Sequence, residues 1–259
     1  MSVQSEFARA AREGGRAALV TVVRSPDGHP EVGARLLVRV DGAREGTLGR
    51  PTLDETAVAA AEELMWAERS ELREHDEVGL FVDVTAPPPR LMVFGAVDFA
   101  GALCRLARAA GWCPYVVDPR ARFATAERFP DAEAVVASWP QEALARLGGI
   151  DRATYIAVLT HDPKLDDAVL DIALRSDAAY VGAMGSRRAN EKRRDRLLAN
   201  GMPSELLGRL AAPIGLDLGA MTAEETALSI MAEVVAVRHG REGGRLSRSG
   251  APRIHEVGA

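Results

Sequence analysis

The stretch YVGAMGSRR combines small residues with cations in a way that suits the binding of an anion. Gly182, Gly185 and Ser186 follow an apolar run, and Arg187 and Arg188 open a helical pattern. A strand that turns into a helix aims backbone N–H groups and the positive end of the helix dipole at one point. Because cations in a first helical turn oppose that dipole, we expect Ser186 to cap the helix and Arg187 or Arg188 to pair with a phosphate-bearing ligand. The alternative is that the two arginines pair with carboxylates of a neighbouring helix or subunit.

A second polar group, Thr160, His161 and Asp162, ends the apolar run of VLTHDP. His161, with a carboxylate beside it, is a candidate proton donor or ligand-orienting group, and a role without ligand contact is equally open. Asp162 precedes a proline, and this order favours a helix cap over a ligand contact. One histidine and one aspartate are too few donors for a metal ion, so we predict no metal site.

The segment VFGAVDFAGAL matches the first turn of a dinucleotide-binding fold only in part. Gly95 and Ala100 fit that pattern, but Val97 occupies the second glycine position and Asp98 brings a negative charge to the helix start. Both differences oppose a pyrophosphate at that helix end, so binding of NAD or NADP is not expected. Asp118 follows at about the spacing of a ribose-binding acid, roughly twenty residues on. A capping aspartate before a proline is the equally open alternative.

Charge and apolar patterning exclude several classes of partner. With 32 basic and 37 acidic residues, the chain carries a net charge of −5 and has no overall attraction to nucleic acid or to a membrane surface. The cations Lys192, Arg193, Arg194 and Arg196 are predicted to form a solvated helix face with i,i+4 pairs. No segment is long and apolar enough for a membrane helix or a signal peptide, so we expect a soluble, cytoplasmic protein.

The N-terminal part predicts a small α+β domain over residues 1–85. A helix is expected over residues 3–13, followed by an antiparallel pair of strands in AALVTVVRS and ARLLVRVD. The alanine-rich stretch from Thr52 to Arg69 predicts a helix capped by Thr52 or Asp54, and EVGLFVDVT predicts a further strand. The prolines of APPPR form a stiff connector, which marks the domain boundary.

Beyond this connector, strand and helix patterns alternate strictly, as is typical of a doubly wound parallel sheet. We therefore predict an α/β fold, with a Rossmann-like parallel-sheet domain over residues 90–239 beside the smaller N-terminal α+β domain. The polar residues named above follow predicted strands, where such a sheet binds ligands. Thr222 and Glu225 are predicted to form the capping box of the last helix, and residues 240–259 a flexible tail. The expected strands lie in RLMVFGA, PYVVD, EAVVAS, TYIAVLT and AAYVGAM.

Five successive segments of the chain resemble signatures of the XdhC/CoxI family, which are accessory proteins of xanthine dehydrogenase and carbon monoxide dehydrogenase type enzymes. The segments follow in order and at natural spacing, and LVTVVRSPDGHPEVGARLLVRVDGAREGTLGR is similar to the N-terminal domain of the family. The segments are PPPRLMVFGA, VVDPRARFATAERFPDA, VLTHDPKLDDAVL, YVGAMGSRRANEKRRDRL and PIGLDLGAMTAEETALSIMAEVVAVR.

The resemblance implies a maturation chaperone, not an enzyme. Such a protein would bind molybdenum cofactor of the molybdopterin type and help to insert it into a xanthine dehydrogenase or carbon monoxide dehydrogenase type molybdoenzyme. The implied partner is an apo-molybdoenzyme client, with a cysteine desulfurase and a second copy of the chain as further candidates. The implied cofactor-binding residues are Gly95, Asp98, Asp118, Arg120, Thr160, His161, Asp162, Gly182, Gly185, Ser186, Arg187 and Arg188.

Two departures from the family pattern concern groups that could contact the cofactor's metal. Relatives usually have Gly-Gly-Cys-(Val/Leu)-Glu after the second strand, where this chain has RPTLD from Arg50 to Asp54. Their first turn is usually Gly-Ala-Gly-His, where this chain reads Gly-Ala-Val-Asp. Cys104 and Cys113 are predicted to be buried thiols rather than replacements. Two alternatives stay open: an NAD(P)-dependent oxidoreductase, suggested by the fold class alone, and a scaffolding paralogue without cofactor.

Overall fold

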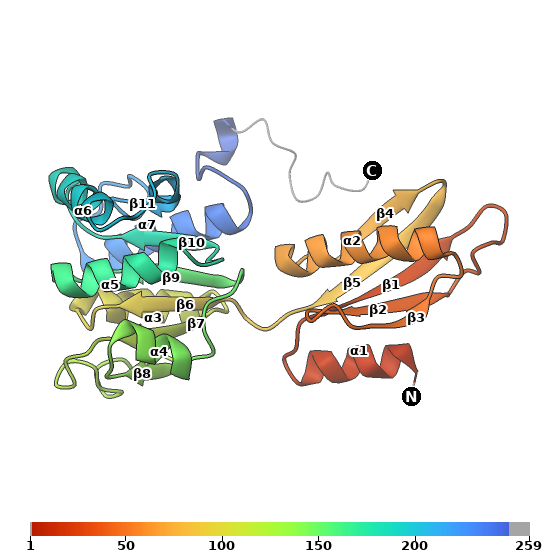
Figure 1. Ribbon diagram of the computed structural model, residues 1–259, viewed down its shortest axis with the longest axis horizontal. Helices are drawn as coiled ribbons and strands as arrows, with labels where there is room; N and C mark the ends of the chain where they lie inside the picture. The colour runs from red at the N-terminus through yellow and green to blue at the C-terminus, as the bar shows by residue number, and fades with distance from the viewer. Residues whose placement is uncertain (1, 249–259) are drawn as a thin grey trace. The chain divides into compact units, whose positions relative to one another are not determined.

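The structure, a computed structural model, describes residues 2–248, and the chain divides into two compact units, one up to Pro88 and one from Pro89 onward (Figure 1). Each unit has its own sheet and its own core. The division falls within the proline connector, whose residues supply no donors to a sheet. Of the tail predicted over residues 240–259, residues 249–259 lie outside the described residues. Within residues 2–248, no helix is both long enough and apolar enough to cross a bilayer.

The first unit is an antiparallel sheet with one helix on each face (Figure 1). Its strand order is β3-β2-β1-β5-β4. Side chains alternate along the central strand, so that Ala18, Val20 and Val22 pack with one helix and Ala17 and Leu19 face the other. The elements are α1 (Val3–Arg12), β1 (Ala17–Arg24), β2 (Arg35–Arg39), β3 (Arg44–Thr47), α2 (Pro51–Ala67), β4 (Glu71–His75) and β5 (Val78–Thr85).

The predicted cap of α2 is wrong. The helix begins at Pro51 rather than at Thr52 or Asp54, with Arg50 in the N-cap position and no side-chain hydrogen bond there. Proline suits the first helical position because its fixed φ is helical and the N–H that it lacks would have no partner. The Asp54 carboxylate instead accepts a hydrogen bond from the Leu48 N–H at 2.7 Å, which ties the helix to the segment before it.

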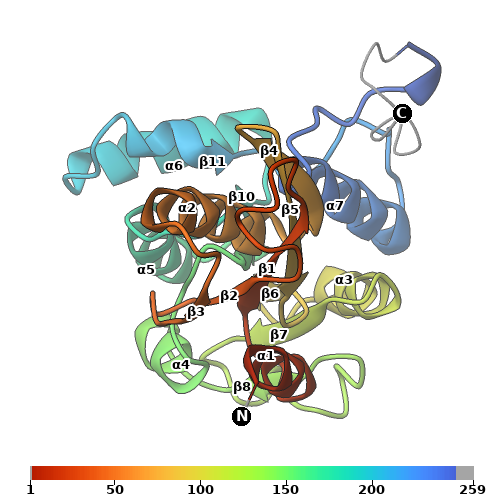
Figure 2. The same ribbon diagram turned by 90° about the vertical axis from the view of Figure 1, so that its right-hand side faces the viewer.

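The second unit is a six-stranded parallel sheet in the order β11-β10-β9-β6-β7-β8, which confirms the predicted Rossmann-like α/β fold. One face packs against α3 and α7, and the other against α4, α5 and α6, as Figure 2 shows. The elements are β6 (Arg90–Phe94), α3 (Asp98–Ala109), β7 (Cys113–Val117), β8 (Ala134–Val136), α4 (Pro140–Arg146), β9 (Thr154–Val158), α5 (Pro163–Leu174), β10 (Tyr180–Ala183), α6 (Arg187–Ala199), β11 (Leu210–Ala211) and α7 (Ala223–Arg238).

Arg90, the first residue of β6, joins two segments of the second unit through its side chain. The Arg90 guanidinium donates hydrogen bonds to the carbonyl oxygens of Leu147 at 2.8 Å and Gly149 at 3.0 Å, and to the Thr154 hydroxyl at 2.7 Å. The start of β6 is thereby fixed to the loop between α4 and β9.

The predicted helix caps of the second unit are confirmed. The Asp162 carboxylate accepts from the Lys164 N–H at 2.9 Å, and the Ser186 hydroxyl accepts from the N–H three residues on at 3.2 Å. Thr222 and Glu225 form the expected capping box of α7. These caps satisfy N–H groups that the helices leave open, so each helix starts where the sequence pattern placed it.

The solvated basic face predicted for α6 is wrong for Arg193, although Lys192 is exposed as expected. Arg193 is only 4% exposed, and its guanidinium pairs with the buried Asp166 of α5 at 2.7 Å. Arg196 pairs with Asp167 of α5 at 3.0 Å, and Arg194 donates to a backbone carbonyl at 2.9 Å. The i,i+4 rule considers only neighbours on the same helix, whereas these cations find their partners on another helix.

Candidate functional site

The carboxyl ends of β6 and β9 meet at the point where the strand order reverses. In a doubly wound sheet this is where ligands bind. Gly95 follows β6 with φ of 111°, and a Cβ atom there would lie 3.0 Å from the backbone nitrogen of Thr160, which follows β9. Glycine at position 95 therefore permits both the turn and the close approach of the two loops. The structure brings these two predicted residues together.

Asp118, at the end of β7, is fully buried and hydrogen-bonded on both carboxylate oxygens. It accepts from the Ala96 N–H at 2.8 Å, and from Nε and Nη2 of Arg120 at 2.9 and 2.7 Å. The Arg120 backbone N–H also donates to it at 2.9 Å. A carboxylate with four donors already in place has little capacity left for a ribose hydroxyl, so the geometry favours an anchoring role for Asp118.

The anchoring role of Asp118 predicts a specific dependence of stability on pH. Burial by itself would raise the pKa of Asp118, but the hydrogen bonds from Arg120 and Ala96 outweigh it and leave the pKa below its ordinary value. A lowered carboxyl pKa stabilises the fold above the unfolded pKa of about 4, and this contribution is lost as the pH falls through the folded pKa. We expect Asp118→Asn to cost about 1 to 3 kcal/mol at neutral pH and less at acid pH. Urea unfolding at pH 7 and pH 3 measures both values, and an equal cost at the two pH values would contradict this role.

The turn between β10 and α6 leaves a row of backbone donors open. Met184 donates its N–H to the Val158 carbonyl at 2.8 Å, but the four following N–H groups, Gly185 to Arg188, have no acceptor within residues 2–248. Gly185 has φ of 137°, a conformation that favours glycine. Open donors at a helix start are suited to an anion.

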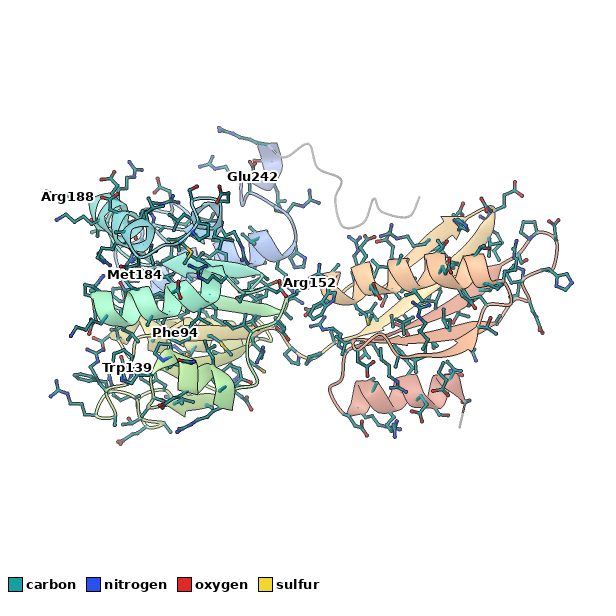
Figure 3. All side chains as sticks on the ribbon, in the orientation of Figure 1. Phe94, Trp139, Arg152, Met184, Arg188 and Glu242 are labelled. Atoms are coloured by element: carbon teal, nitrogen blue, oxygen red, sulfur yellow. The ribbon has the colours of Figure 1, made fainter. Side chains whose placement is uncertain are left out.

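Arg187 and Arg188 are exposed, and neither pairs with a carboxylate within the described range. Figure 3 labels Arg188, on the outer side of α6, and Met184, where the turn begins. Two cations without a carboxylate partner in residues 2–248, next to four open donors, give this turn a local positive charge although the chain as a whole is acidic.

Gly182 lies inside β10 and not in this turn. A Cβ atom at Gly182 would lie 2.5 Å from both Ile214 Cγ1 and the Tyr180 hydroxyl. That hydroxyl hydrogen-bonds to Glu233 of α7. The absence of a side chain at position 182 is therefore explained by packing, whereas Gly185 lies in the turn as predicted.

The loop after β9 holds Thr160, His161 and Asp162. The Thr160 hydroxyl accepts from the Asp162 N–H at 2.9 Å, and Asp162 caps α5, so both polar groups have local partners. His161 is exposed in the same loop. Of the three residues, Thr160 is buried, whereas His161 and Asp162 are exposed.

A cluster of arginines around Phe123 borders the first turn; Arg120 was predicted as part of the site, whereas Arg122, Phe123 and Arg128 were not. The guanidinium carbons of Arg122, Arg120 and Arg128 lie 4.4, 4.8 and 5.8 Å from the centre of the Phe123 ring. Arg128 also donates to the Ala96 carbonyl at 3.1 Å. The signal in the sequence was the spacing of three arginines around one phenylalanine, in which guanidinium groups can stack on the ring.

Asp98, the first residue of α3, is an exposed acid at the edge of this cluster. Its side chain is 95% exposed and lies 3.4 Å from Nη2 of Arg128. A negative charge at this helix start is favourable to the helix dipole and unfavourable to a bound pyrophosphate.

The two thiols do not face the carboxyl edge as reactive groups. Cys104 is 1% exposed within the core, and burial raises its pKa to about 12, so it stays protonated. Cys113 is half-buried at the first residue of β7, at the opposite end of the strand from Asp118. In the described part of the chain, no three His, Cys, Asp or Glu side chains gather as metal ligands do.

Two family profiles match the chain in succession. The profile described as "XdhC and CoxI family" matches residues 10–76, and the profile described as "XdhC Rossmann domain" matches residues 91–234. The second match alone covers more than half of the chain, and together the two matches follow the division into units.

Curated relatives are similar over nearly all of the chain or over about three fifths of it. YqeB of Escherichia coli K12, described as uncharacterized, is 26% identical over 99% of this chain. A protein of Bacillus subtilis 168 described as a probable xanthine dehydrogenase subunit is 30% identical over 61%, and the molybdenum cofactor insertion chaperone PaoD of E. coli K12 is 31% identical over 59%. The chain spans about half the length of these relatives, covering 50%, 46% and 41% of them.

A solved structure has the same fold. The crystal structure of a xanthine dehydrogenase from Bacillus halodurans, so described, aligns with a TM-score of 0.65 and 23% sequence identity. The alignment covers 92% of this chain and 66% of that one. At this identity the likeness concerns the fold alone.

Proposed function

Because the chain belongs to the XdhC and CoxI family, we propose that it is an accessory protein of a molybdoenzyme, binding molybdenum cofactor as cargo and helping to insert it into the client. The observation that carries this proposal is the turn from Gly185 to Arg188, with open backbone donors and two exposed arginines. The cargo of a molybdopterin type carries a phosphate, which this turn suits. The similarity to a molybdenum cofactor insertion chaperone supports the same role.

The residues present fit the phosphate end of this cargo and offer little to its metal end. Four N–H donors and two guanidinium groups suit a doubly charged phosphate. In contrast, the family's usual cysteine and first-turn histidine are replaced in this chain, and Cys104 is buried. We therefore propose that the chain holds the cargo by the phosphate and leaves the metal accessible to the client.

In this proposal the chain binds and releases its cargo and makes no covalent bond to it. The N–H groups of Gly185–Arg188 bind the phosphate, and the loops at Gly95 and His161 border the rest of the ligand. Asp118, which is itself paired with Arg120, holds the turn after β6 in place through its hydrogen bond from the Ala96 N–H. The metal supplies the client's redox chemistry after transfer, so no general acid or nucleophile is required of this chain.

Anaerobic purification of the full chain tests the proposal. A strain that makes molybdenum cofactor should yield protein with bound pterin, released on denaturation and detected by its fluorescence after oxidation. The same preparation from a strain unable to make the cofactor is the control. Protein from the first strain that contains no more pterin than the control would support the scaffolding paralogue instead.

We expect no binding of NAD or NADP in the micromolar range. Val97 and the exposed Asp98 oppose a pyrophosphate at the start of α3, and the oxygens of Asp118 already have their donors. Calorimetric titration with each nucleotide measures this. The double variant Val97→Gly, Asp98→Asn should strengthen any residual binding. A micromolar constant for the unaltered chain would revive the oxidoreductase alternative.

A further inference from the structure

A buried polar cluster packs against the proposed phosphate turn. Asp166 of α5 is 2% exposed, and Asn190 and Arg193 of α6 are 3% and 4% exposed. Arg193 donates to Asp166 at 2.7 Å and also hydrogen-bonds to the Asn190 side-chain oxygen. Charged groups are rarely buried this completely unless they are paired, because removing them from water is costly.

The cluster also bonds to the backbone of the turn. Nη2 of Arg193 donates to the Met184 carbonyl at 3.0 Å, and Nδ2 of Asn190 donates to the Gly185 carbonyl at 3.0 Å. In addition, Nη1 of Arg193 lies 3.7 Å from the position of a Cβ atom at Gly185, so the cation lies close against the glycine. Two consecutive peptide groups of the turn are thus held from the protein side.

Because the peptide bond is planar, the hydrogen bonds to the Met184 and Gly185 carbonyls also fix the direction of the N–H group in each of the two peptides. In a trans peptide the C=O and the following N–H point in opposite directions. With the Met184 and Gly185 carbonyls drawn toward the buried cluster, the N–H groups of Gly185 and Ser186 must point away from it. These are two of the four N–H groups that have no acceptor in residues 2–248.

We propose that Asn190, Arg193 and Asp166 are positioning residues that hold the turn in its anion-binding orientation. Asn190 and Arg193 orient the two peptide groups, and Asp166 holds Arg193. This inference rests on the proposed function of the turn, and it adds three residues that do not touch the ligand. Two atoms of the cluster, Asp166 Oδ1 and Arg193 Nε, are buried without a hydrogen-bond partner in residues 2–248.

The neighbouring pair Arg196–Asp167 provides a matched comparison. It also joins α6 to α5, through two hydrogen bonds of 3.0 Å, but it makes no hydrogen bond to the turn. If the buried cluster served only to join the two helices, removing the cluster or removing the Arg196–Asp167 pair should change the affinity for a ligand at the turn by the same amount.

The test compares Asn190→Leu, which is uncharged and similar in size, with the double variant Asp167→Asn, Arg196→Gln, which removes the neighbouring pair without changing the net charge. The probe is inorganic pyrophosphate, titrated by calorimetry into the full chain. We expect Asn190→Leu to weaken pyrophosphate binding about ten- to a hundredfold. The double variant should change it by less than about threefold. Asn190→Ala, which favours the helix, repeats the comparison if the leucine variant does not fold.

Each outcome decides the inference. Selective loss in the Asn190 variants supports it, whereas unchanged affinity, or equal loss in the double variant, overturns it. Failure of the unaltered chain to bind pyrophosphate overturns the anion turn and the inference together. If the Asn190 variants selectively lose pyrophosphate binding but the purified chain never contains pterin, the positioning role is supported and the molybdenum cofactor is refuted as cargo. Failure of the inference and failure of the proposed function are therefore distinguishable.

Discussion

Replacing Arg187 and Arg188 together by alanine is expected to lower the retained pterin about ten- to a hundredfold without lowering the thermal stability of the chain. The loss of one charge-assisted hydrogen bond to a phosphate costs about 1.5 to 3 kcal/mol, which corresponds to that range in affinity, and the loss would be larger if both arginines contact the phosphate. Both side chains are exposed and neither has a carboxylate partner in the described residues, so folding should not depend on them. Pterin fluorescence per mole of purified protein and a melting curve measure the two effects.

The double variant Arg146→Ala, Lys192→Ala is the control for this experiment. It removes the same charge from exposed positions outside the turn, Arg146 in the last turn of α4 and Lys192 on α6. It should retain the pterin of the unaltered chain, because a general change of charge has little effect on a specific contact. Pterin that survives loss of both Arg187 and Arg188 would place the phosphate elsewhere, and a lowered melting temperature would favour the structural alternative.

The largest expected loss of stability follows Arg193→Met. The substitution leaves the carboxylate of Asp166, 2% exposed, without its cation, which typically costs about 3 to 5 kcal/mol. Burial already raises the pKa of Asp166 despite Arg193, and removal of Arg193 raises it further. An acid with a raised pKa in the folded chain favours folding at low pH and loses this contribution as the pH rises through that pKa. The cost should therefore be smaller at pH 4 than at pH 7, as urea unfolding at the two values would show.

Two further variants separate this effect from a general loss of contacts. Arg196→Met removes the more exposed neighbouring cation and should cost no more than about 1 kcal/mol. The double variant Asp166→Leu, Arg193→Met removes both buried charges and should recover most of the stability. A single Arg193→Met variant as stable as Arg196→Met would show that the buried pair is not important for folding.

The fold of the second unit could be predicted because each of its central strands is buried on both faces. RLMVF and TYIAV are continuous apolar runs between helical patterns, and this arrangement has few solutions other than a parallel sheet. The edge strands β3 and β4 could not be predicted in this way. Their sequences, REGT and ELREH, carry charged side chains, and they are strands because a neighbouring strand offers them hydrogen bonds.

The candidate site was predictable where its residues follow strands. Gly95, Asp118 and Ser186 could be located because parallel strands place their carboxyl ends at one edge. The buried partners of α6 could not, because the contact between Arg193 and Asp166 joins residues that are 27 positions apart. Gly182 shows the limit of reasoning from glycine alone, since the sequence does not distinguish a glycine that a turn requires from one that a neighbouring side chain requires.

The position of Arg90 decides where the second unit can be separated from the first. A fragment that starts at Pro89 keeps the arginine and its three hydrogen bonds to the segment 147–154, whereas a fragment that starts at Leu91 lacks all three. At about 0.5 to 1.5 kcal/mol for each bond, the shorter fragment gives up a large part of the stability of an ordinary domain. The carbonyl groups of Leu147 and Gly149 would also lose these protein donors. Any attempt to express the second unit by itself should therefore begin within the prolines and retain Arg90.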